Sequence, residues 1–203
     1  ASDITIVIAE LKETEESVKR FYKQGFRAFK IKIGRDEDLD VKRVLAVKKL
    51  APRSAIYLDA NQGYSAGQTL RFLKTIAKDG VLPQLIEQPV HRDDFDGLMQ
   101  VTRECKVPVC ADESARSLSE AATIIRKKAA QVINIKTMKT GIFESREIAL
   151  LARANGIGLM AGGMMETSLA MTASAHMAAG LGCFDFIDLD TPFFIKGAVG
   201  KNP

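Results

Sequence analysis

Residues 28–61 read AFKIKIGRDEDLDVKRVLAVKKLAPRSAIYLDAN. Two short runs rich in apolar and β-branched residues, Ala28–Ile33 and Ala55–Leu58, flank a segment of helical period at Asp38–Leu50. Short apolar runs are typical of strands that are buried on both faces, as in a parallel sheet. The stretch therefore predicts a strand, a crossover helix and a second strand parallel to the first.

The same alternation continues along the whole chain at near-even spacing. The expected strands are Ile4–Ile8, Ala28–Ile33, Ala55–Leu58, Leu82–Ile86, Val107–Cys110, Gln131–Ile135, Ile157–Met160 and Phe184–Leu189. The expected helices are Glu15–Gln24, Asp38–Leu50, Ala66–Lys78, Phe95–Glu104, Leu118–Lys127, Ile142–Ala154 and Ser168–Gly180. An open doubly wound sheet and a closed barrel both fit this alternation. The even spacing favours the barrel, so we expect residues 1–203 to form one TIM-like (β/α)7β barrel domain of α/β class with parallel strands.

Residues at the ends of the expected helices support these bounds. The expected start signals are Thr14, Ser65 and Ser117, the last with Glu120 three residues on as in a capping box, and the expected stop signals are Gly25, Gly80 and Gly156.

Composition excludes several classes of protein. The chain has 203 residues, of which 46% are hydrophobic and 27% charged, and this excludes a membrane bundle or a disordered chain. No run approaches the roughly 20 apolar residues of a spanning helix, and no signal peptide opens the chain. The net charge of +4 is spread along the sequence, so we expect neither nucleic acid nor a membrane as a partner. Cys105, Cys110 and Cys183 form no C-x-x-C pair and indicate reduced thiols in a cytoplasmic protein.

Lysines stand at the ends of two expected strands. Lys30 and Lys32 are two residues apart, so both point to the same side of their strand and into the barrel, although two solvated lysines would also fit a strand end. Lys136 follows the sixth expected strand, which in an eight-stranded barrel lies opposite the second. Lys136 should therefore face Lys32 across the barrel. Burying an ammonium group is costly. Near other cations in a dry cavity, its pKa can fall into a range useful for proton transfer.

Carboxylates directly follow three successive expected strands, at Asp59, Glu87 and Asp112. The carboxyl ends of parallel barrel strands share one rim, which is where active sites of such barrels lie. Three acids on one rim repel one another unless a cation lies among them. Carboxylate oxygens are ligands that Mg²⁺ prefers, so the trio predicts a magnesium site. The residues expected to surround its ligands are Asn61, Glu113 and Glu166.

A further acidic pair, Asp188 and Asp190, ends the last expected strand. The D-x-D spacing points both carboxylates to the same side. The pair fits a second metal site, and it equally fits a binding site for a substrate ammonium group.

Taken together, these residues resemble the enolase superfamily, in its muconate-lactonizing subgroup. The matching pieces are Lys30-Ile31-Lys32, Asp59-Ala60-Asn61, Glu87-Gln88-Pro89, Asp112-Glu113-Ser114 and Asn134-Ile135-Lys136. They occur in order, each at the end of an expected strand. Within the subgroup, the D-x-D is similar to that of the dipeptide epimerases, the group that includes L-Ala-D/L-Glu epimerase, where two acids hold the α-ammonium of the dipeptide.

The resemblance implies a Mg²⁺-dependent isomerase, a racemase or epimerase that removes and replaces the α-proton of a carboxylate through an enediolate. The implied substrate is a dipeptide. Lys32 and Lys136 would act as acid and base on opposite faces, and Lys30 would give electrostatic support. The family also has a second, α+β capping domain, which we expect to be absent from this chain, so we expect the barrel alone to be inactive. The expected partners are a small-molecule substrate and further copies of the chain.

Other activities remain open on the sequence. Within the superfamily they are o-succinylbenzoate synthase, N-succinylamino acid racemase and cycloisomerase, whose substrates carry no free ammonium for the D-x-D. From other classes, Lys32 or Lys136 could form a Schiff base as in a metal-independent aldolase barrel, or the barrel could bind ligands without catalysis. The three carboxylates argue against the aldolase, and the lysines on both faces argue against a silent barrel.

Overall fold

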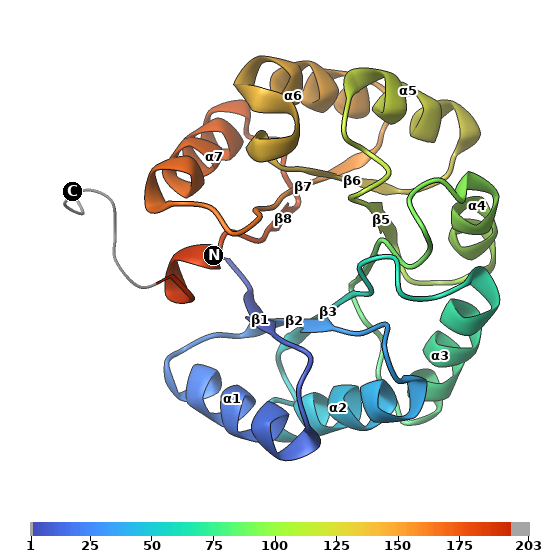
Figure 1. Ribbon diagram of the computed structural model, residues 1–203, viewed down its shortest axis with the longest axis vertical. Helices are drawn as coiled ribbons and strands as arrows, with labels where there is room; N and C mark the ends of the chain where they lie inside the picture. The colour runs from blue at the N-terminus through green and yellow to red at the C-terminus, as the bar shows by residue number, and fades with distance from the viewer. Residues whose placement is uncertain (1, 196–203) are drawn as a thin grey trace.

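The computed structural model describes residues 2–195, which form a ring of parallel strands enclosed by helices (Figure 1). The strands are β1 (Ile4–Ile6), β2 (Ala28–Lys32), β3 (Ala55–Asp59), β4 (Leu85–Glu87), β5 (Val109–Ala111), β6 (Val132–Ile135), β7 (Gly158–Ala161) and β8 (Phe186–Ile187). The helices are α1 (Leu11–Lys23), α2 (Glu37–Leu50), α3 (Ala66–Lys78), α4 (Phe95–Glu104), α5 (Leu118–Lys127), α6 (Thr137–Ala154), α7 (Ser168–Leu181) and the 3₁₀ helix η1 (Thr191–Phe193). The predicted domain covers residues 1–203, of which 1 and 196–203 lie outside the described part.

Neighbouring strands pair in chain order from β1 to β8, which confirms the predicted (β/α)7β order. The β2–β3 ladder ends with Lys32 opposite Asp59, so the first candidate base and the first candidate metal ligand are neighbours on the rim. Between β8 and β1 the ring is joined by the Asp3 N–H, which donates to the Ile187 carbonyl oxygen at 3.2 Å. The strands thus surround a closed interior.

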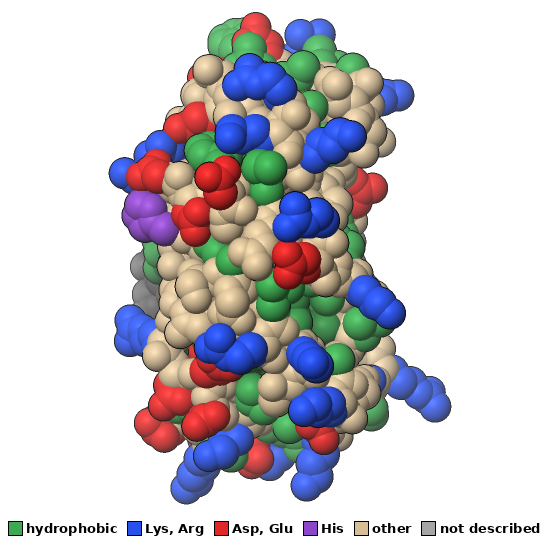
Figure 2. All heavy atoms as spheres, turned by 90° about the vertical axis from the view of Figure 1, so that its right-hand side faces the viewer, with side chains coloured by type: hydrophobic (Ala, Val, Ile, Leu, Met, Phe, Trp, Pro, Cys, Tyr) green, Lys and Arg blue, Asp and Glu red, His purple; other side chains and the backbone are tan. Residues whose placement is uncertain are grey.

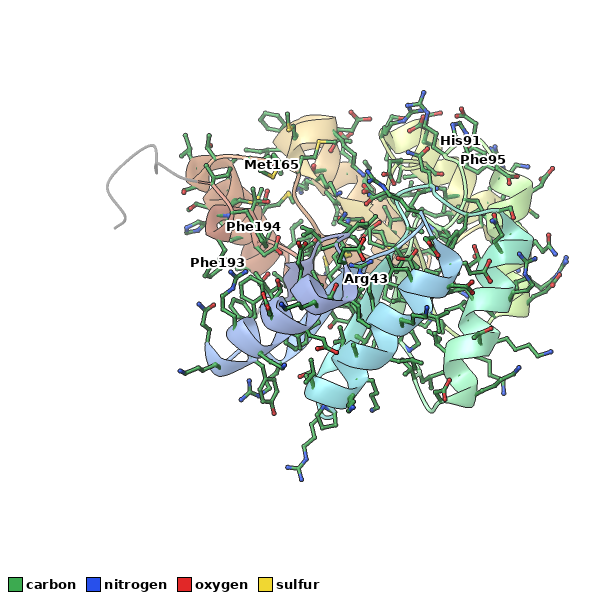
Figure 3. All side chains as sticks on the ribbon, turned by 60° about the horizontal axis from the view of Figure 1, so that its bottom comes forward. Arg43, His91, Phe95, Met165, Phe193 and Phe194 are labelled. Atoms are coloured by element: carbon green, nitrogen blue, oxygen red, sulfur yellow. The ribbon has the colours of Figure 1, made fainter. Side chains whose placement is uncertain are left out.

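Aromatic side chains that follow β8 pack against α1 and the segment between α1 and β2, where the helix ring passes from α7 to α1. Phe193 packs edge-on against Phe26, with 5.4 Å between ring centroids, and Phe194 packs against Phe21 at 6.3 Å. Both lie at the side of the barrel occupied by α1 and α7 (Figure 3). The segment after β8 therefore covers a part of the ring that no helix fills.

Successive residues of each strand enter two different cores, because side chains alternate across a strand. The larger core lies between strands and helices and contains Phe29, Ile31, Leu58, Ile86 and Ile133. The smaller one fills the interior of the barrel and consists of Leu85, Cys110, Val132 and Met160, with Tyr57 and Phe186 against it. Two residues further along these strands, on the same inward face, the side chains become polar, except in β7, where Met160 is followed by Gly162. The apolar plug therefore forms the base on which the candidate site is built.

The first helix differs from its prediction at its start. α1 begins at Leu11 rather than Glu15, so the predicted start signal at Thr14 is wrong. Thr14 is buried in the first turns, and its hydroxyl accepts a hydrogen bond from Arg43 Nε at 3.0 Å. Arg43 is fully buried on α2 and also donates to the carbonyl oxygens of Val7 and Lys32 (Figure 3). Local sequence rules assign this threonine to a helix cap, but in the structure its hydroxyl is engaged by a tertiary hydrogen bond instead.

Helix caps follow the predictions in part. The bounds of α3, α4 and α5 are those predicted, and the three predicted stop glycines have positive φ. Ser117 caps α5, but its capping box is incomplete because the Glu120 carboxylate binds the backbone and guanidinium of Arg116 instead. The complete box is at Ser65, whose partner is Gln68.

The region after β6 also differs from its prediction. α6 begins at Thr137 rather than Ile142, directly after Lys136, and it is kinked at Gly141, where φ is 68°. The early start fixes the position of the residues that follow Lys136. Three strands are shorter than predicted: β1 ends at Ile6, β4 begins only at Leu85 and ends at Glu87, and β8 is reduced to Phe186–Ile187.

Charged side chains of both signs are interspersed on the face shown in Figure 2. None of the helices that the structure describes has the length and apolar character needed to cross a bilayer.

Candidate active site

The predicted site residues come together at the carboxyl ends of the strands. Most of them border a cavity of about 610 Å³, whose lining does not include Asp59, Glu87 or Glu166. Its charged lining includes Lys30, Lys32, Asp112, Lys136, Asp188 and Asp190, and its apolar rim consists of Val7, Met164, Met165 and Phe194. Each polar residue has this position because it lies on the inward face, beyond the apolar plug.

Lys30 lies at the centre of the buried acids. Its ammonium is 2.6 Å from Asp188 Oδ2, 2.7 Å from Glu87 Oε2 and 3.2 Å from Asp59 Oδ2, and the residue is only 2% exposed. Burial alone would lower the pKa of Lys30, but Asp188, Glu87 and Asp59 outweigh it and hold this pKa well above the ordinary value. These three carboxylates therefore favour the charged form of Lys30, which is what an electrostatic role requires.

Lys32 and Lys136 approach the acids from opposite sides of the ring. Lys32 Nζ donates to Asp59 Oδ2 at 2.6 Å, whereas Lys136 Nζ donates to Asp112 Oδ2 at 2.6 Å. The side chain of Lys32 is 26% exposed and that of Lys136 is 7% exposed. β2 and β6 are separated by three strands on each side of the eight-stranded ring. The predicted opposition of the two lysines agrees with this geometry.

The electrostatics of Lys136 differ from the sequence-based expectation. We expected burial and nearby cations to lower its pKa. Burial does act in that direction, but Asp112 and Glu87 outweigh it, so the pKa of Lys136 is raised. The cause is direct pairing of the ammonium with a carboxylate. Any cation that binds Asp112 in place of the Lys136 ammonium would remove the cause of the raised pKa.

The three candidate metal ligands surround the two inner lysines. Asp59 and Glu87 both contact Lys30, and Glu87 and Asp112 both lie within 4.0 Å of Lys136 Nζ, so adjacent carboxylates share an ammonium neighbour. All three are buried. The trio is nevertheless spread around the ammonium groups. The acidic oxygens that lie within 4.8 Å of one another among the described residues belong to Asp3, Asp188 and Asp190.

The carboxyl groups of the trio differ in their pKa. Burial, followed by Asp59, raises the pKa of Glu87 to about 7. Burial alone would raise the pKa of Asp112 as well, but Lys139 and Lys136 outweigh it and keep this pKa below the ordinary value. Glu87 Oε2 accepts no hydrogen bond of proper geometry, although the Lys30 ammonium is close to it. Glu87 is therefore the carboxyl group that is least compensated by its surroundings.

The residues present fit a divalent cation. The buried carboxyl groups of Asp3, Asp59, Glu87, Asp112, Asp188 and Asp190 outnumber the lysines that reach them, Lys30, Lys32, Lys136 and Lys139. The donor atoms of the trio are all carboxylate oxygens, which suit Mg²⁺. The incompletely compensated Glu87 lies between the other two ligands on adjacent strands, which is where such an ion would bind.

Of the three residues expected around the metal ligands, two lie there. The Asn61 amide oxygen accepts from Lys32 at 2.8 Å, and its amide nitrogen donates to Glu113 Oε1 at 3.2 Å. Glu166 lies elsewhere, because its Oε1 accepts the Met164 N–H at 2.9 Å. It shapes the loop after β7 and thus positions the methionines at the cavity rim.

The acidic pair after β8 is anchored on one oxygen of each carboxylate. Asp188 Oδ2 accepts from Lys30, and Asp190 Oδ2 accepts from the Thr5 N–H at 2.6 Å. Within the described chain no hydrogen bond engages the other oxygen of either carboxylate, and both residues line the cavity. Burial, followed by Asp188, raises the pKa of Asp190. The pair can therefore accept hydrogen bonds from a cationic group in the cavity.

Two residues of the site escaped the sequence analysis. Lys139 Nζ donates to Asp112 Oδ1 at 2.7 Å and to the carbonyl oxygens of Asp112 and Asn134 at 2.8 and 2.9 Å. Lys139 lies three residues after Lys136, about one helical turn. This spacing places the two lysines on the same side once α6 is known to begin at Thr137. Asp3 was missed because it precedes β1, although it is two residues before the inward-facing Thr5.

Fold and site together define a TIM-type barrel domain with an acid-rich and lysine-rich centre at its carboxyl-terminal rim. Residues 13–196 match the family described as "Enolase C-terminal domain-like". The chain belongs to this family, which confirms the predicted resemblance.

Known relatives of this chain include dipeptide epimerases. A hydrophobic dipeptide epimerase of Citrifermentans bemidjiense is 53% identical over 206 residues, covering 100% of this chain and 56% of that protein. A substrate-liganded L-Ala-D/L-Glu epimerase of Bacillus subtilis is 35% identical with a TM-score of 0.95. The match covers 98% of this chain and 56% of that protein. A dipeptide epimerase of Enterococcus faecalis, complexed with Mg and L-Leu-L-Tyr, is 34% identical with a TM-score of 0.94, at the same coverage. The chain spans about half the length of the relatives it matches.

Proposed function

We propose that the protein containing this chain is a Mg²⁺-dependent dipeptide epimerase, which inverts the α-carbon next to a carboxylate through an enediolate. The observation that carries the proposal is the placement of Lys32 and Lys136 on opposite sides of a cavity that Asp112 also lines, with the buried carboxylates Asp59 and Asp112 paired to the two lysines. The relatives named as dipeptide epimerases support it.

Asp59, Glu87 and Asp112 would hold the metal ion. When bound, Mg²⁺ would stabilise the negative charge that develops on the substrate carboxylate as the α-proton leaves. Binding would engage the carboxylates that now pair with lysines. The ammonium of Lys136 would lose Asp112 as a partner, which removes the main cause of its raised pKa.

Lys32 and Lys136 would transfer the proton. One neutral amine takes the α-proton from one face of the substrate, and the other lysine delivers a proton to the opposite face. A carbon held between two groups on opposite sides is thereby inverted. Lys30 would keep its contact with Asp188 when the metal engages Asp59 and Glu87, and its positive charge would favour both the enediolate and the neutral form of Lys32.

The two acids after β8 would select the substrate. Asp188 and Asp190 would bind the free α-ammonium of a dipeptide through the oxygens that Lys30 and Thr5 do not engage. The rim residues Met164, Met165 and Phe194 are apolar and partly exposed, which favours hydrophobic side chains on the substrate. The relative named as a hydrophobic dipeptide epimerase agrees with this assignment.

An N-succinylamino acid racemase is the second candidate. A solved N-succinyl Arg/Lys racemase of Bacillus cereus is 30% identical with a TM-score of 0.93. Its succinylated substrate class has no free α-ammonium, so Asp188 and Asp190 would have no α-ammonium to bind. We therefore favour the dipeptide.

A library of dipeptides incubated in D₂O with the complete protein and Mg²⁺ tests the proposal. We expect deuterium at the α-carbon of hydrophobic dipeptides, detected by mass spectrometry, and formation of the second stereoisomer. Exchange that occurs only with N-succinylated amino acids would replace the proposal by the second candidate. The absence of exchange with every member of both sets would refute both.

A further inference from the structure

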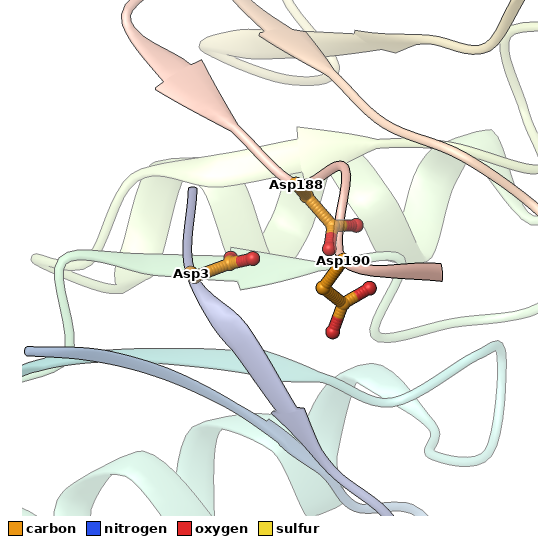
Figure 4. A group of neighbouring side chains, drawn as sticks. All are labelled: Asp3, Asp188 and Asp190. Atoms are coloured by element: carbon orange, nitrogen blue, oxygen red, sulfur yellow. The ribbon is translucent and has the colours of Figure 1, made fainter. Parts of the chain in front are cut away.

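Asp3, immediately before β1, is a buried carboxyl group without a hydrogen-bond partner. It is only 1% exposed, and neither of its oxygens accepts a hydrogen bond from any residue between 2 and 195. One oxygen each of Asp3, Asp188 and Asp190 lie within 4.8 Å of one another, and Figure 4 shows the Asp3 side chain directed toward the other two. An ionised carboxylate left in this state is strongly unfavourable.

The charges around Asp3 do not supply a counter-ion for it. The groups that face it are Asp188 and Asp190 from the segment after β8, Lys30 from β2 and the phenol of Tyr57 from β3. The Lys30 ammonium is already in contact with Asp188, Asp59 and Glu87. In the proposed function the substrate ammonium would neutralise one further acid of the D-x-D. Within residues 2–195, Lys30 is the cation that acts on the pKa of Asp3, and its ammonium is already shared among these other acids.

We propose that Asp3 is a neutral carboxylic acid that donates its proton to Asp188 and thereby positions Asp188 to bind the substrate ammonium. Ionisation of two buried carboxyl groups whose oxygens lie within 4.8 Å of each other is unfavourable, and a proton on Asp3 would convert their repulsion into a hydrogen bond. Burial, and then the neighbouring Asp188, raises the pKa of Asp3 well above its ordinary value, which agrees with the geometry.

Asp3 acts through Asp188 and is a positioning residue. It does not border the substrate cavity but a separate cavity at the amino-terminal ends of the strands, together with Tyr57 and Phe186. Asp188 is then held from two sides, by the Lys30 ammonium on Oδ2 and by the Asp3 hydroxyl. The effect of Asp3 on substrate binding rests on the proposed function. The protonation of Asp3 does not depend on the proposed function.

Infrared difference spectroscopy tests the protonation directly. The complete protein, loaded with Mg²⁺ and without dipeptide, is compared with its Asp3→Asn variant in D₂O at neutral pH. We expect the wild-type protein to show the carbonyl band of a protonated carboxylic acid and the variant to lack it. Asp96→Asn is the matched control, because the Asp96 side chain is 92% exposed and its replacement should leave the band unchanged. A band of the same intensity in Asp3→Asn and the wild-type protein would overturn the proposal.

Steady-state kinetics then test the positioning role. Asn can still donate to Asp188, so Asp3→Asn should keep KM for a free dipeptide near the wild-type value. Asp3→Leu lacks the donor, and we expect it to raise KM about ten- to hundredfold with a smaller change in kcat, as loss of a charge-assisted hydrogen bond predicts. Equal KM values for both variants would refute the role.

Two further outcomes are informative. Equilibrium dialysis with Mg²⁺ that shows one bound ion fewer in Asp3→Asn than in the wild-type protein would mean that a cation, not a proton, occupies the cluster. If no dipeptide is a substrate, the proposed function fails, while the infrared comparison still decides the state of Asp3.

Discussion

Replacing Lys139 with methionine should destabilise the protein by several times the effect of an ordinary lysine substitution. The Lys139 side chain is 6% exposed, and its ammonium makes the bonds to Asp112 and to the Asn134 carbonyl that fix the end of β6. Methionine keeps most of the side-chain length and removes the charge. Asp112 then retains Lys136 on Oδ2, but Oδ1 loses its donor inside the protein.

The magnitude follows from what remains buried. Removing one partner of a buried ion pair typically costs about 3–5 kcal/mol. Because Lys136 still compensates one oxygen of Asp112, we expect a loss near the lower end, about 3 kcal/mol. The lowered pKa of Asp112 adds a pH dependence. A lowered folded-state pKa contributes stability above the unfolded value of about 3.9 and loses it as the pH falls further. The difference between wild type and variant should therefore be full at neutral pH and shrink below about pH 4.

Urea unfolding of the metal-free complete protein at several pH values measures this difference. Lys74→Met is the control, because Lys74 is exposed on α3 and its replacement should change the free energy of unfolding by no more than about 0.5 kcal/mol. A loss for Lys139→Met no larger than that of the control would refute the assignment of Lys139 as a structural cation of the site. A loss that does not change between pH 7 and pH 3 would refute the role of the Asp112 pair.

Three further predictions follow from the site. Asp190→Asn in the complete protein should raise KM for free dipeptides much more than for N-acylated ones, and equal effects on both would contradict ammonium binding. Because the pKa of Glu87 is raised to about 7, its neutral form contributes stability below its unfolded pKa of about 4.3, and this contribution is lost as the pH rises through 7. Mg²⁺ binding should accordingly release more protons at pH 6 than at pH 8, as calorimetry in buffers of different ionisation enthalpy would show. Gly34→Ala should lower the free energy of unfolding, because φ is 108° there and a Cβ would lie 2.6 Å from the Ala60 carbonyl oxygen; unchanged thermal stability would contradict this.

The barrel order could be predicted because burial imposes it locally. Parallel strands that are covered on both faces must be apolar, and helices that cover them must be amphipathic, so both patterns are visible without knowledge of contacts. The starts of α1 and α6 could not be predicted in this way. Thr14 is of a residue type that favours the N-cap position, but its hydroxyl accepts a hydrogen bond from Arg43 of another helix. Pairing between residues distant in sequence overrides local preference at such points.

The site was predictable to the extent that it follows period-2 alternation at strand ends. Asp59, Glu87 and Asp112 extend the inward faces of strands whose apolar residues the sequence shows plainly. Lys139 lies in a helix and Asp3 in the segment before β1. Because neither is part of a strand, the alternation of side chains along strands does not predict their positions. The sign of the Lys136 pKa shift depends on whether its ammonium or a metal ion engages Asp112, which spacing does not determine. The oligomeric state and the cytoplasmic location stay predictions.

The central claim is that Lys32 and Lys136 serve opposite faces of one substrate carbon. Exchange of the α-proton in D₂O, run separately on each stereoisomer of a dipeptide substrate with the complete protein, tests it most directly. Lys32→Ala should abolish exchange from one stereoisomer and leave some exchange from the other, and Lys136→Ala should give the mirror result. Both variants should lose epimerisation by at least about 10²–10⁴-fold, since inversion needs both groups. Epimerisation at near wild-type rate without one of the lysines would contradict the two-base mechanism.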